Sequence, residues 1–204
     1  IMKKSLIFII PIILALVSIG VASYYFSDDL RKQNLSDTKS TGEATIGGSF
    51  TLTDQDNHQV NDGQFRGKYM LVFFGFTNCP DICPVGLAVL TDVMEQLGDD
   101  AKKVQPIFIS IDPERDTPER LKEFLANFDP SIIGLTGTPE QIKAVESAYK
   151  VYASKSENED MPGGYNVDHS GFMYLMDKNA KYVKHFTYNA EATKMASDIK
   201  ASID

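Results

Sequence analysis

Hydrophobic and polar positions divide the chain into three stretches, of which the first is apolar. Residues 5–26 contain no charged side chain. At about 1.5 Å per residue, a helix over this run is long enough to cross a hydrocarbon core of roughly 30 Å. Lys3 and Lys4 precede the run, whereas acidic and basic residues balance one another just after it. This asymmetry predicts that residues 1–4 are cytoplasmic and that the rest of the chain is exported.

A cleaved signal peptide is the alternative interpretation of this run. The apolar core of such a peptide is typically about 7–15 residues long and ends in small side chains. Here Ala22 and Ser23 are followed at once by three aromatic residues at 24–26, which are typical of the membrane interface. We therefore expect an uncleaved transmembrane anchor over residues 5–26.

The second stretch is polar and the third is a domain. Residues 27–44 are mostly small and polar, as in a flexible linker. Residues 45–204 are enough for a single domain with a full core. The formal net charge is −8, and the acidic excess lies beyond residue 35. Such a surface argues against nucleic acid as a partner, while it permits a cation or a partner with a basic face.

Strand and helix patterns alternate along the third stretch. The runs at 69–77 and 105–112 are almost continuously apolar, as in strands buried on both faces. Thr138 and Gln141 form a capping box with Pro139 in the first helical turn. This order predicts an α/β domain with a thioredoxin-like fold, in which helices flank a central mixed sheet. The expected strands are residues 48–53, 69–77, 105–112, 132–135, 171–177 and 181–187, and the expected helices are residues 82–97, 117–128, 138–149 and 190–203.

The two cysteines of the chain, Cys79 and Cys83, fall together at a strand-to-helix turn. Free backbone N–H groups and the helix dipole favour thiolate there. Side chains four residues apart on a helix share one face, so the two sulfurs can hold a single soft ion. A disulfide is the alternative, although this spacing strains it and thioredoxin-type motifs have two intervening residues rather than three. Inert packing of both thiols is disfavoured, because prolines flank them at the helix start.

Histidine is the natural third partner of two thiolates, and the chain has 3. His58 lies in a polar turn, where we expect it to be solvated. His185 lies in a strand with lysines, where we expect a half-buried role without ligation. His169 differs, because it follows a loop at 157–164 rich in Gly, Pro and acidic residues and precedes an apolar strand, a setting in which sites are often built. Asp168 is a candidate for orienting its ring.

Two thiolates and one imidazole form a soft donor set that suits copper as Cu(I) or Cu(II). A structural zinc site would usually add a fourth protein ligand, often another cysteine, and the chain has none left. Met173 and Met176 fall in an apolar strand and are expected in the core. We expect Arg115 to pair with a neighbouring aspartate, and Asp112, at a strand end, is a candidate for shaping the site.

Four segments, in the same order along the chain, resemble the Sco/SenC family of membrane-anchored copper proteins with a thioredoxin fold, which are needed to assemble cytochrome c oxidase. They are FFGFTNCPDICP at 73–84, FISIDPERDTP at 108–118, GLTGT at 134–138 and VDHS at 167–170. The resemblance implies that Cys79, Cys83 and His169 are copper ligands. It also implies cytochrome c oxidase subunit II as a partner, with a thioredoxin-like reductant and a copper donor. Many members have a histidine in place of Asn78, and acidic or hydroxyl residues in place of Val85 and Gly86, so the partner-facing surface differs.

Two functional classes follow from these residues. The first is a copper chaperone that binds copper through two cysteines and a histidine and assists assembly of the dinuclear copper site of the oxidase. The second is a thiol–disulfide oxidoreductase in which Cys79 and Cys83 are the redox pair that reduces the cysteines of subunit II. A redox or copper sensor is a third hypothesis. A thiol peroxidase is disfavoured, because Phe76 and Pro80 stand where peroxiredoxins have a threonine.

The expected location is the bacterial inner membrane, with a single pass and the C-terminal domain in the periplasm. We expect this location rather than an organelle because residues 1–4 do not resemble an Arg- and Ser-rich transit peptide. The mitochondrial inner membrane, with the domain facing the intermembrane space, is the alternative.

Overall fold

The computed structural model describes residues 46–203. The predicted cytoplasmic segment 1–4, anchor 5–26 and linker 27–44 all lie outside this range and stay predictions. Within 46–203, no helix is both long and apolar enough to cross a membrane.

A seven-stranded mixed sheet forms the centre of the described part, in the order β2-β1-β5-β4-β3-β8-β9. Strands β3, β4 and β5 run parallel, whereas β8, β9, β1 and β2 pair antiparallel with their neighbours. The apolar runs predicted at 69–77 and 105–112 form the central β3 and β4, which are buried on both faces. The strands of this sheet are β1 (Thr51–Asp54), β2 (Gln59–Asn61), β3 (Tyr69–Gly75), β4 (Val104–Ser110), β5 (Ile133–Thr136), β8 (Phe172–Met176) and β9 (Tyr182–Thr187).

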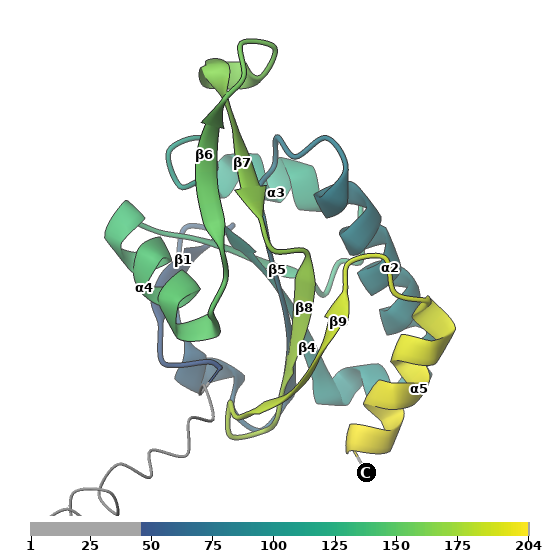
Figure 1. Cartoon of the computed structure of the whole chain (residues 1–204). Helices are drawn as coiled ribbons and strands as arrows, with labels where there is room; N and C mark the ends of the chain where they lie inside the picture. The colour runs from purple at the N-terminus through teal and green to yellow at the C-terminus, as the bar shows by residue number, and fades with distance from the viewer. Residues whose placement is uncertain (1–45, 204) are drawn as a thin grey trace, which may run out of the picture. The chain divides into compact units, whose positions relative to one another are not determined.

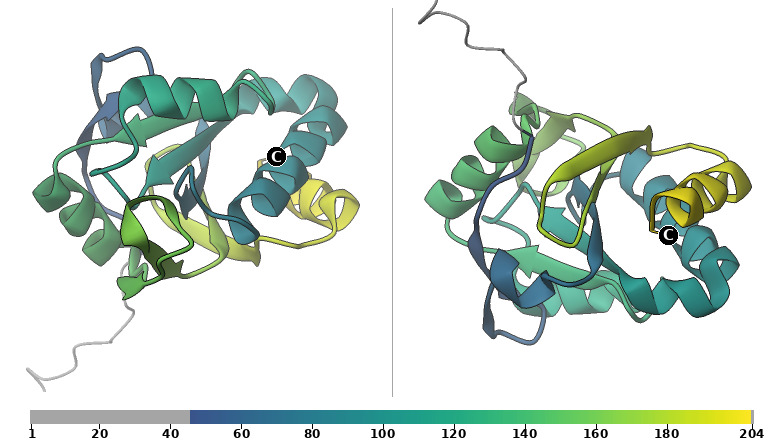
Figure 2. Two further views of the ribbon diagram at one scale, coloured as in Figure 1. Left: turned by 90° about the horizontal axis from the view of Figure 1, so that it is seen from above. Right: turned by 90° about the horizontal axis from the view of Figure 1, so that it is seen from below.

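Helices cover both faces of the sheet, as expected (Figures 1 and 2). The ring of Phe73 on β3 contacts Phe108, which in turn contacts Phe124 of α3, at centroid distances of 5.9 and 6.0 Å. The next residue, Phe74, points to the opposite face and meets Tyr149 of α4 at 5.3 Å. Helix α5 packs along α2 on the side away from α4 (Figure 1). The helices are α2 (Ile82–Leu97), α3 (Pro118–Leu125), α4 (Pro139–Tyr149) and α5 (Ala192–Ile203), and the short 3-10 helices are η1 (Asp62–Phe65), η2 (Gly98–Lys103) and η3 (Pro162–Gly164).

Local sequence signals explain where the helices begin. Thr138 accepts a hydrogen bond from the backbone of Gln141, whose side chain bonds back to the Thr138 N–H, so the predicted capping box is present. Thr117 caps α3 in the same position, with Pro118 following. Helix α3 ends at Leu125, three residues earlier than expected, and the chain then turns through backbone hydrogen bonds.

A second, two-stranded sheet was not predicted. Strands β6 (Ala153–Glu157) and β7 (Tyr165–His169) pair antiparallel and form a hairpin that projects beyond one end of the main sheet (Figure 1). The loop expected at 157–164 is therefore the tip of this hairpin. Its strands are polar and short, and Val167 is the one buried residue among the five of β7, so they lack the alternation that identifies strands in a sequence.

Candidate metal centre

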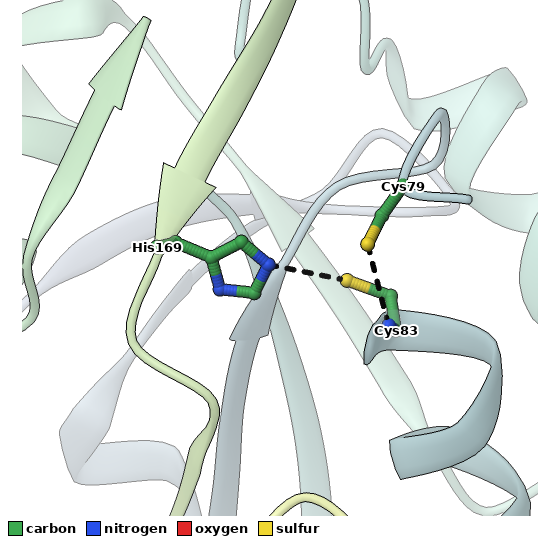
Figure 3. Close-up of side chains that lie close together, drawn as sticks. All are labelled: Cys79, Cys83 and His169. Carbon is green, nitrogen blue, oxygen red and sulfur yellow. Dashed lines mark hydrogen bonds between the residues drawn. The ribbon is translucent and has the colours of Figure 1, made fainter. Parts of the chain in front are cut away.

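The turn between β3 and α2 holds the two cysteines as predicted. After Gly75 the chain turns, and the Cys79 N–H donates to the Phe76 carbonyl over 3.2 Å. Cys83 lies in the first turn of α2, and its backbone N–H donates to the Cys79 sulfur over 3.4 Å (Figure 3). A helix N-terminus has N–H groups without helical partners, and Cys79 accepts one of them. The backbone of the turn thus supplies a hydrogen-bond donor that stabilises negative charge on the Cys79 sulfur.

Gly75 makes room for the second sulfur. A Cβ placed on Gly75 would lie 2.4 Å from the Cys83 Sγ and 2.8 Å from the Phe108 ring. A side chain at this position would therefore displace the sulfur, and the strand can end directly beneath α2 because it ends in glycine. Cys83 is fully buried, whereas Cys79 keeps 8% of its surface exposed.

His169, the last residue of β7, brings the third ligand atom. Its Nε2 lies 3.7 Å from the Cys83 Sγ (Figure 3). Its Nδ1 lies 3.0 Å from the Ser170 carbonyl oxygen. A carbonyl only accepts, so Nδ1 carries the proton and Nε2 turns its lone pair toward the sulfurs. Asp168 was a candidate for orienting this ring, but it is exposed, and the backbone of Ser170 does so instead. The edge of the ring also packs on Phe76, at a centroid distance of 5.8 Å.

The three side chains together have the composition of a soft metal site. One ligand atom from each of Cys79, Cys83 and His169 lies within 4.8 Å of the others. Thiolates and a neutral imidazole are the donors that copper prefers, and three protein ligands leave a coordination position for an exchanging partner. A pocket of about 260 Å³ opens on one side of the cluster and is lined by Cys79, Pro80, Asp81 and His169, among others. The residues present therefore fit a copper ion.

The pKa values of the two thiols are shifted in opposite directions. Hydrogen bonding from Cys83 and, to a smaller extent, from the backbone lowers the pKa of Cys79 from its ordinary 9.0 to about 4, against the opposing effect of burial. Burial, followed by the neighbouring Cys79, raises the pKa of Cys83 well above that value. The pair therefore holds a single proton at neutral pH, with the charge on Cys79 and the proton on Cys83.

Two buried aspartates, Asp112 and Asp116, lie in the turn that follows β4. Asp116 is buried and accepts hydrogen bonds from the Thr77 N–H (3.0 Å), the Thr77 hydroxyl (2.6 Å) and the Ser110 hydroxyl (2.6 Å). It thereby fixes the chain two residues before Cys79. Burial raises the pKa of Asp116, which these hydrogen bonds partly counteract. The predicted ion pair of Arg115 is with Asp112, which is fully buried.

The remaining sequence-predicted candidates lie away from the cluster. His58 is exposed and lies 3.4 Å from an Asp54 oxygen. His185 is exposed rather than half-buried, and its Nδ1 lies 2.6 Å from the Tyr182 hydroxyl. Met173 and Met176 are buried in the core, as expected. The sequence interpretation did not single out Gly75, whose position at the end of an apolar strand was its only signal, or Ser170, whose role lies in its backbone.

The fold and the cluster define a class: an α/β protein of the thioredoxin type, with two cysteines at a strand-to-helix turn and a histidine facing them. The family model described as SCO1/SenC matches residues 38–204. The chain belongs to this family.

A curated relative and two solved structures are similar to this chain over about three quarters of its length or more. A "SCO2-like protein" of Rickettsia felis is 38% identical over 203 residues, which cover 98% of this chain and 99% of the relative. The structure of Bradyrhizobium japonicum ScoI with copper bound is 44% identical, with a TM-score of 0.71 over 76% of this chain and 98% of that one. BsSco, described with a disulfide switch as a member of the Sco family of cytochrome c oxidase assembly proteins, is 28% identical with a TM-score of 0.63, over 78% and 95% of the two chains.

Proposed function

We propose that this protein is a membrane-anchored copper chaperone. It binds one copper ion through Cys79, Cys83 and His169 and assists assembly of the dinuclear copper site in subunit II of cytochrome c oxidase. The observation that carries the proposal is the convergence of two sulfurs and an imidazole Nε2 within 4.8 Å on a family fold, next to an open pocket. The copper bound to a relative that is 44% identical supports the metal assignment.

Each ligand group has a distinct part in holding the cargo. Cys79 is the thiolate at neutral pH and the more exposed sulfur, so it meets an incoming copper ion first. Cys83 then ligates with loss of its proton, since the metal ligand is the thiolate. His169 adds a neutral nitrogen donor with its ring held by Ser170. A site open on one side permits a partner's ligands to replace these groups one at a time.

The remaining parts of the proposal concern location and partners. Residues 5–26 anchor the chain in the bacterial inner membrane and residues 27–44 let the domain, 45–204, reach its target in the periplasm, or in the mitochondrial intermembrane space for an organellar protein. A copper donor and a thioredoxin-like reductant serve the site, because copper loading needs both thiols reduced.

A thiol–disulfide reductase is the second candidate, and the observation behind it is the opposite pKa shift of the two thiols, which supplies one attacking and one resolving sulfur. The Cys79 thiolate would attack one sulfur of the disulfide in subunit II, forming a mixed disulfide and releasing the first target thiolate. Cys83, after losing its proton, would attack the Cys79 sulfur and release the second target thiolate. Two electrons pass to the target, Cys79 and Cys83 become the disulfide, and an external dithiol reductant restores them.

Copper binding with and without the histidine separates the two functions. The full chain in detergent is reduced under anaerobic conditions, and its affinity for Cu(I) is measured by competition with a chromophoric chelator. We expect one copper per chain, and at least an approximately tenfold weaker affinity for His169→Ala, equal to about 1.4 kcal/mol. His185→Ala, which removes an exposed histidine away from the sulfurs, is the matched control and should bind as the unaltered chain does.

Disulfide exchange is measured on the same proteins with an oxidised dithiol peptide. A chaperone loses copper retention in His169→Ala, whatever happens to exchange. The reductase hypothesis would be favoured over the chaperone by two results together. His169→Ala would leave copper affinity unchanged, and the protein would reduce the peptide rapidly in a reaction that needs both cysteines.

A further inference from the structure

His169 is the last residue of β7, a strand that is not part of the seven-stranded sheet. Among the strands at 46–203, β7 pairs only with β6, and the two form a sheet of their own. The strand contributes a single buried residue, Val167, to the core. The cysteines, in contrast, lie between the central strand β3 and the buried face of α2. His169 precedes β8 by three residues, so the main sheet restrains that end of β7, and contacts elsewhere on the hairpin are needed to hold the rest of it relative to the sulfurs.

Arg115 makes contacts of that kind with the hairpin. Its Nη1 donates to the carbonyl oxygens of Pro162 and Tyr165, the second over 2.9 Å. Its guanidinium carbon lies 3.8 Å from the centroid of the Tyr165 ring. One side chain thus holds the tip of the hairpin and the first residue of β7 at the same time.

The other side of Arg115 is attached to the rigid part of the domain. Its Nε donates to Asp112, a carboxylate with 0% side-chain exposure, and the Arg115 side chain itself is only 12% exposed. The Tyr165 hydroxyl donates to the second oxygen of Asp112 over 2.7 Å. The guanidinium carbon also lies 5.7 Å from the centroid of Phe76, the residue whose ring packs against His169. Arg115 therefore touches both the segment that leads to Cys79 and the strand that ends at His169.

We infer that Arg115 is a positioning residue: it fastens the β6–β7 hairpin to the turn after β4 and so sets the distance between the imidazole and the two sulfurs. The inference rests on the proposed function only where it concerns copper. A planar guanidinium that donates in two directions and stacks on a ring is what the geometry uses, and lysine supplies none of these features beyond the charge.

The first test needs no metal. Hydrogen–deuterium exchange of the reduced full chain is followed by mass spectrometry for unaltered protein, Arg115→Ala and Arg115→Lys. We expect faster exchange in peptides that cover β6 and β7 for both variants, while β3 and β4 stay protected, which also shows that the domain is folded. Glu114→Gln is the matched control. It breaks the exposed ion pair of Glu114 with Lys155, at 2.7 Å, between the same two segments, and should leave exchange unchanged.

The second test measures whether the His169 imidazole coordinates copper. Electron paramagnetic resonance of Cu(II) added to each reduced protein reports nitrogen from the imidazole beside the thiolates, with His169→Ala as the reference without it. We expect the nitrogen signal to weaken in Arg115→Ala and Arg115→Lys, and copper affinity to fall by about 10- to 100-fold, the usual effect of removing a group that orients a ligand. Tyr165→Phe, which loses one hydrogen bond and keeps the ring, should have a smaller effect.

Three results would contradict the positioning role of Arg115. Unchanged exchange of β6 and β7 in Arg115→Ala would show that the hairpin is held by other contacts. Restoration of both exchange and nitrogen signal by Arg115→Lys would show that charge, not geometry, matters. If Arg115→Ala speeds exchange in the hairpin but leaves the nitrogen signal at full strength, Arg115 does not position His169. If the unaltered chain binds no copper, the proposed function fails, and the exchange measurement alone then decides for or against the positioning role.

Discussion

Gly75→Ala is the most direct perturbation of the sulfur site that the packing suggests. The added Cβ would lie 2.4 Å from the Cys83 Sγ and 2.8 Å from Cε2 of Phe108. Non-bonded carbon atoms pack favourably from about 3.5 Å and the larger sulfur needs at least as much, so the contact with the Cys83 Sγ is short by at least about 1 Å. Cys83 and Phe108 are both fully buried, between β3, β4 and the helices that cover them. Neither can yield by moving into solvent.

The expected cost follows from this overlap. Inserting a methyl group into a close-packed core typically costs about 1–3 kcal/mol. In a domain of this size each kcal/mol corresponds to about 2–4 °C, so the melting temperature of the reduced, metal-free chain should fall by about 2–12 °C. Thermal and urea unfolding, followed by circular dichroism in the presence of reductant, measure the change. Copper affinity should fall as well, because the sulfur that has to move is a proposed ligand.

A double-mutant cycle identifies the atom responsible. In a Cys83→Ala background the sulfur is gone, and Gly75→Ala should cost less there than in the unaltered chain. Residues in contact typically show coupling energies of about 0.5–3 kcal/mol, whereas independent sites add to within about 0.5 kcal/mol. Additive free energies for Gly75→Ala and Cys83→Ala would refute the reasoning, since they would mean that the added methyl group and the sulfur do not compete for space.

Two further predictions concern charge and helix packing. Because the pKa of Cys79 is lowered to about 4, its folded thiolate stabilises the protein fully above the unfolded pKa near 9. This contribution is lost as pH falls toward 4. Thiolate ultraviolet absorbance should therefore titrate near pH 4 and vanish in Cys79→Ser; absorbance that appears only near pH 9 would contradict the assigned charge. Gly86→Ala should lower the melting temperature, although alanine gains about 1 kcal/mol in helix propensity, because its Cβ would lie 2.6 Å from the Phe73 ring. Unfolding that moves to higher temperature would show that α2 can shift away from β3.

The parts of the fold that the sequence predicts are those whose signal is local. Strands β3 and β4 are buried on both faces, so their sequences are continuous apolar runs. The cap at Thr138 depends only on residues of the first turn of α4. The hairpin of β6 and β7 has no such signal. Its strands are held by pairing with each other and by side-chain contacts with the turn after β4, among them those of Arg115, a residue about 50 positions away along the chain from Tyr165. Long-range polar contacts of this type leave no period in the sequence.

The site divides in the same way. Cys79 and Cys83 could be predicted because four residues of one turn fix their relation, whereas nothing in the spacing places His169 beside them. Its selection came from the character of the flanking segments and from the family resemblance. The tautomer of its ring depends on the Ser170 carbonyl, and the position of the Cys83 sulfur depends on the absence of a side chain at Gly75. Backbone groups and absent atoms become visible only in three dimensions.

The sulfur pair by itself does not separate copper delivery from disulfide reduction. In both, the Cys79 thiolate would act first, and the more deeply buried Cys83 would follow after losing its proton. The imidazole is different, because a dithiol reductase attacks and resolves with sulfur alone. Yet His169 has its Nδ1 proton engaged by a carbonyl and its Nε2 directed at Cys83. A neutral nitrogen lone pair held in that direction serves as a ligand, which is why the arrangement favours copper delivery over disulfide reduction.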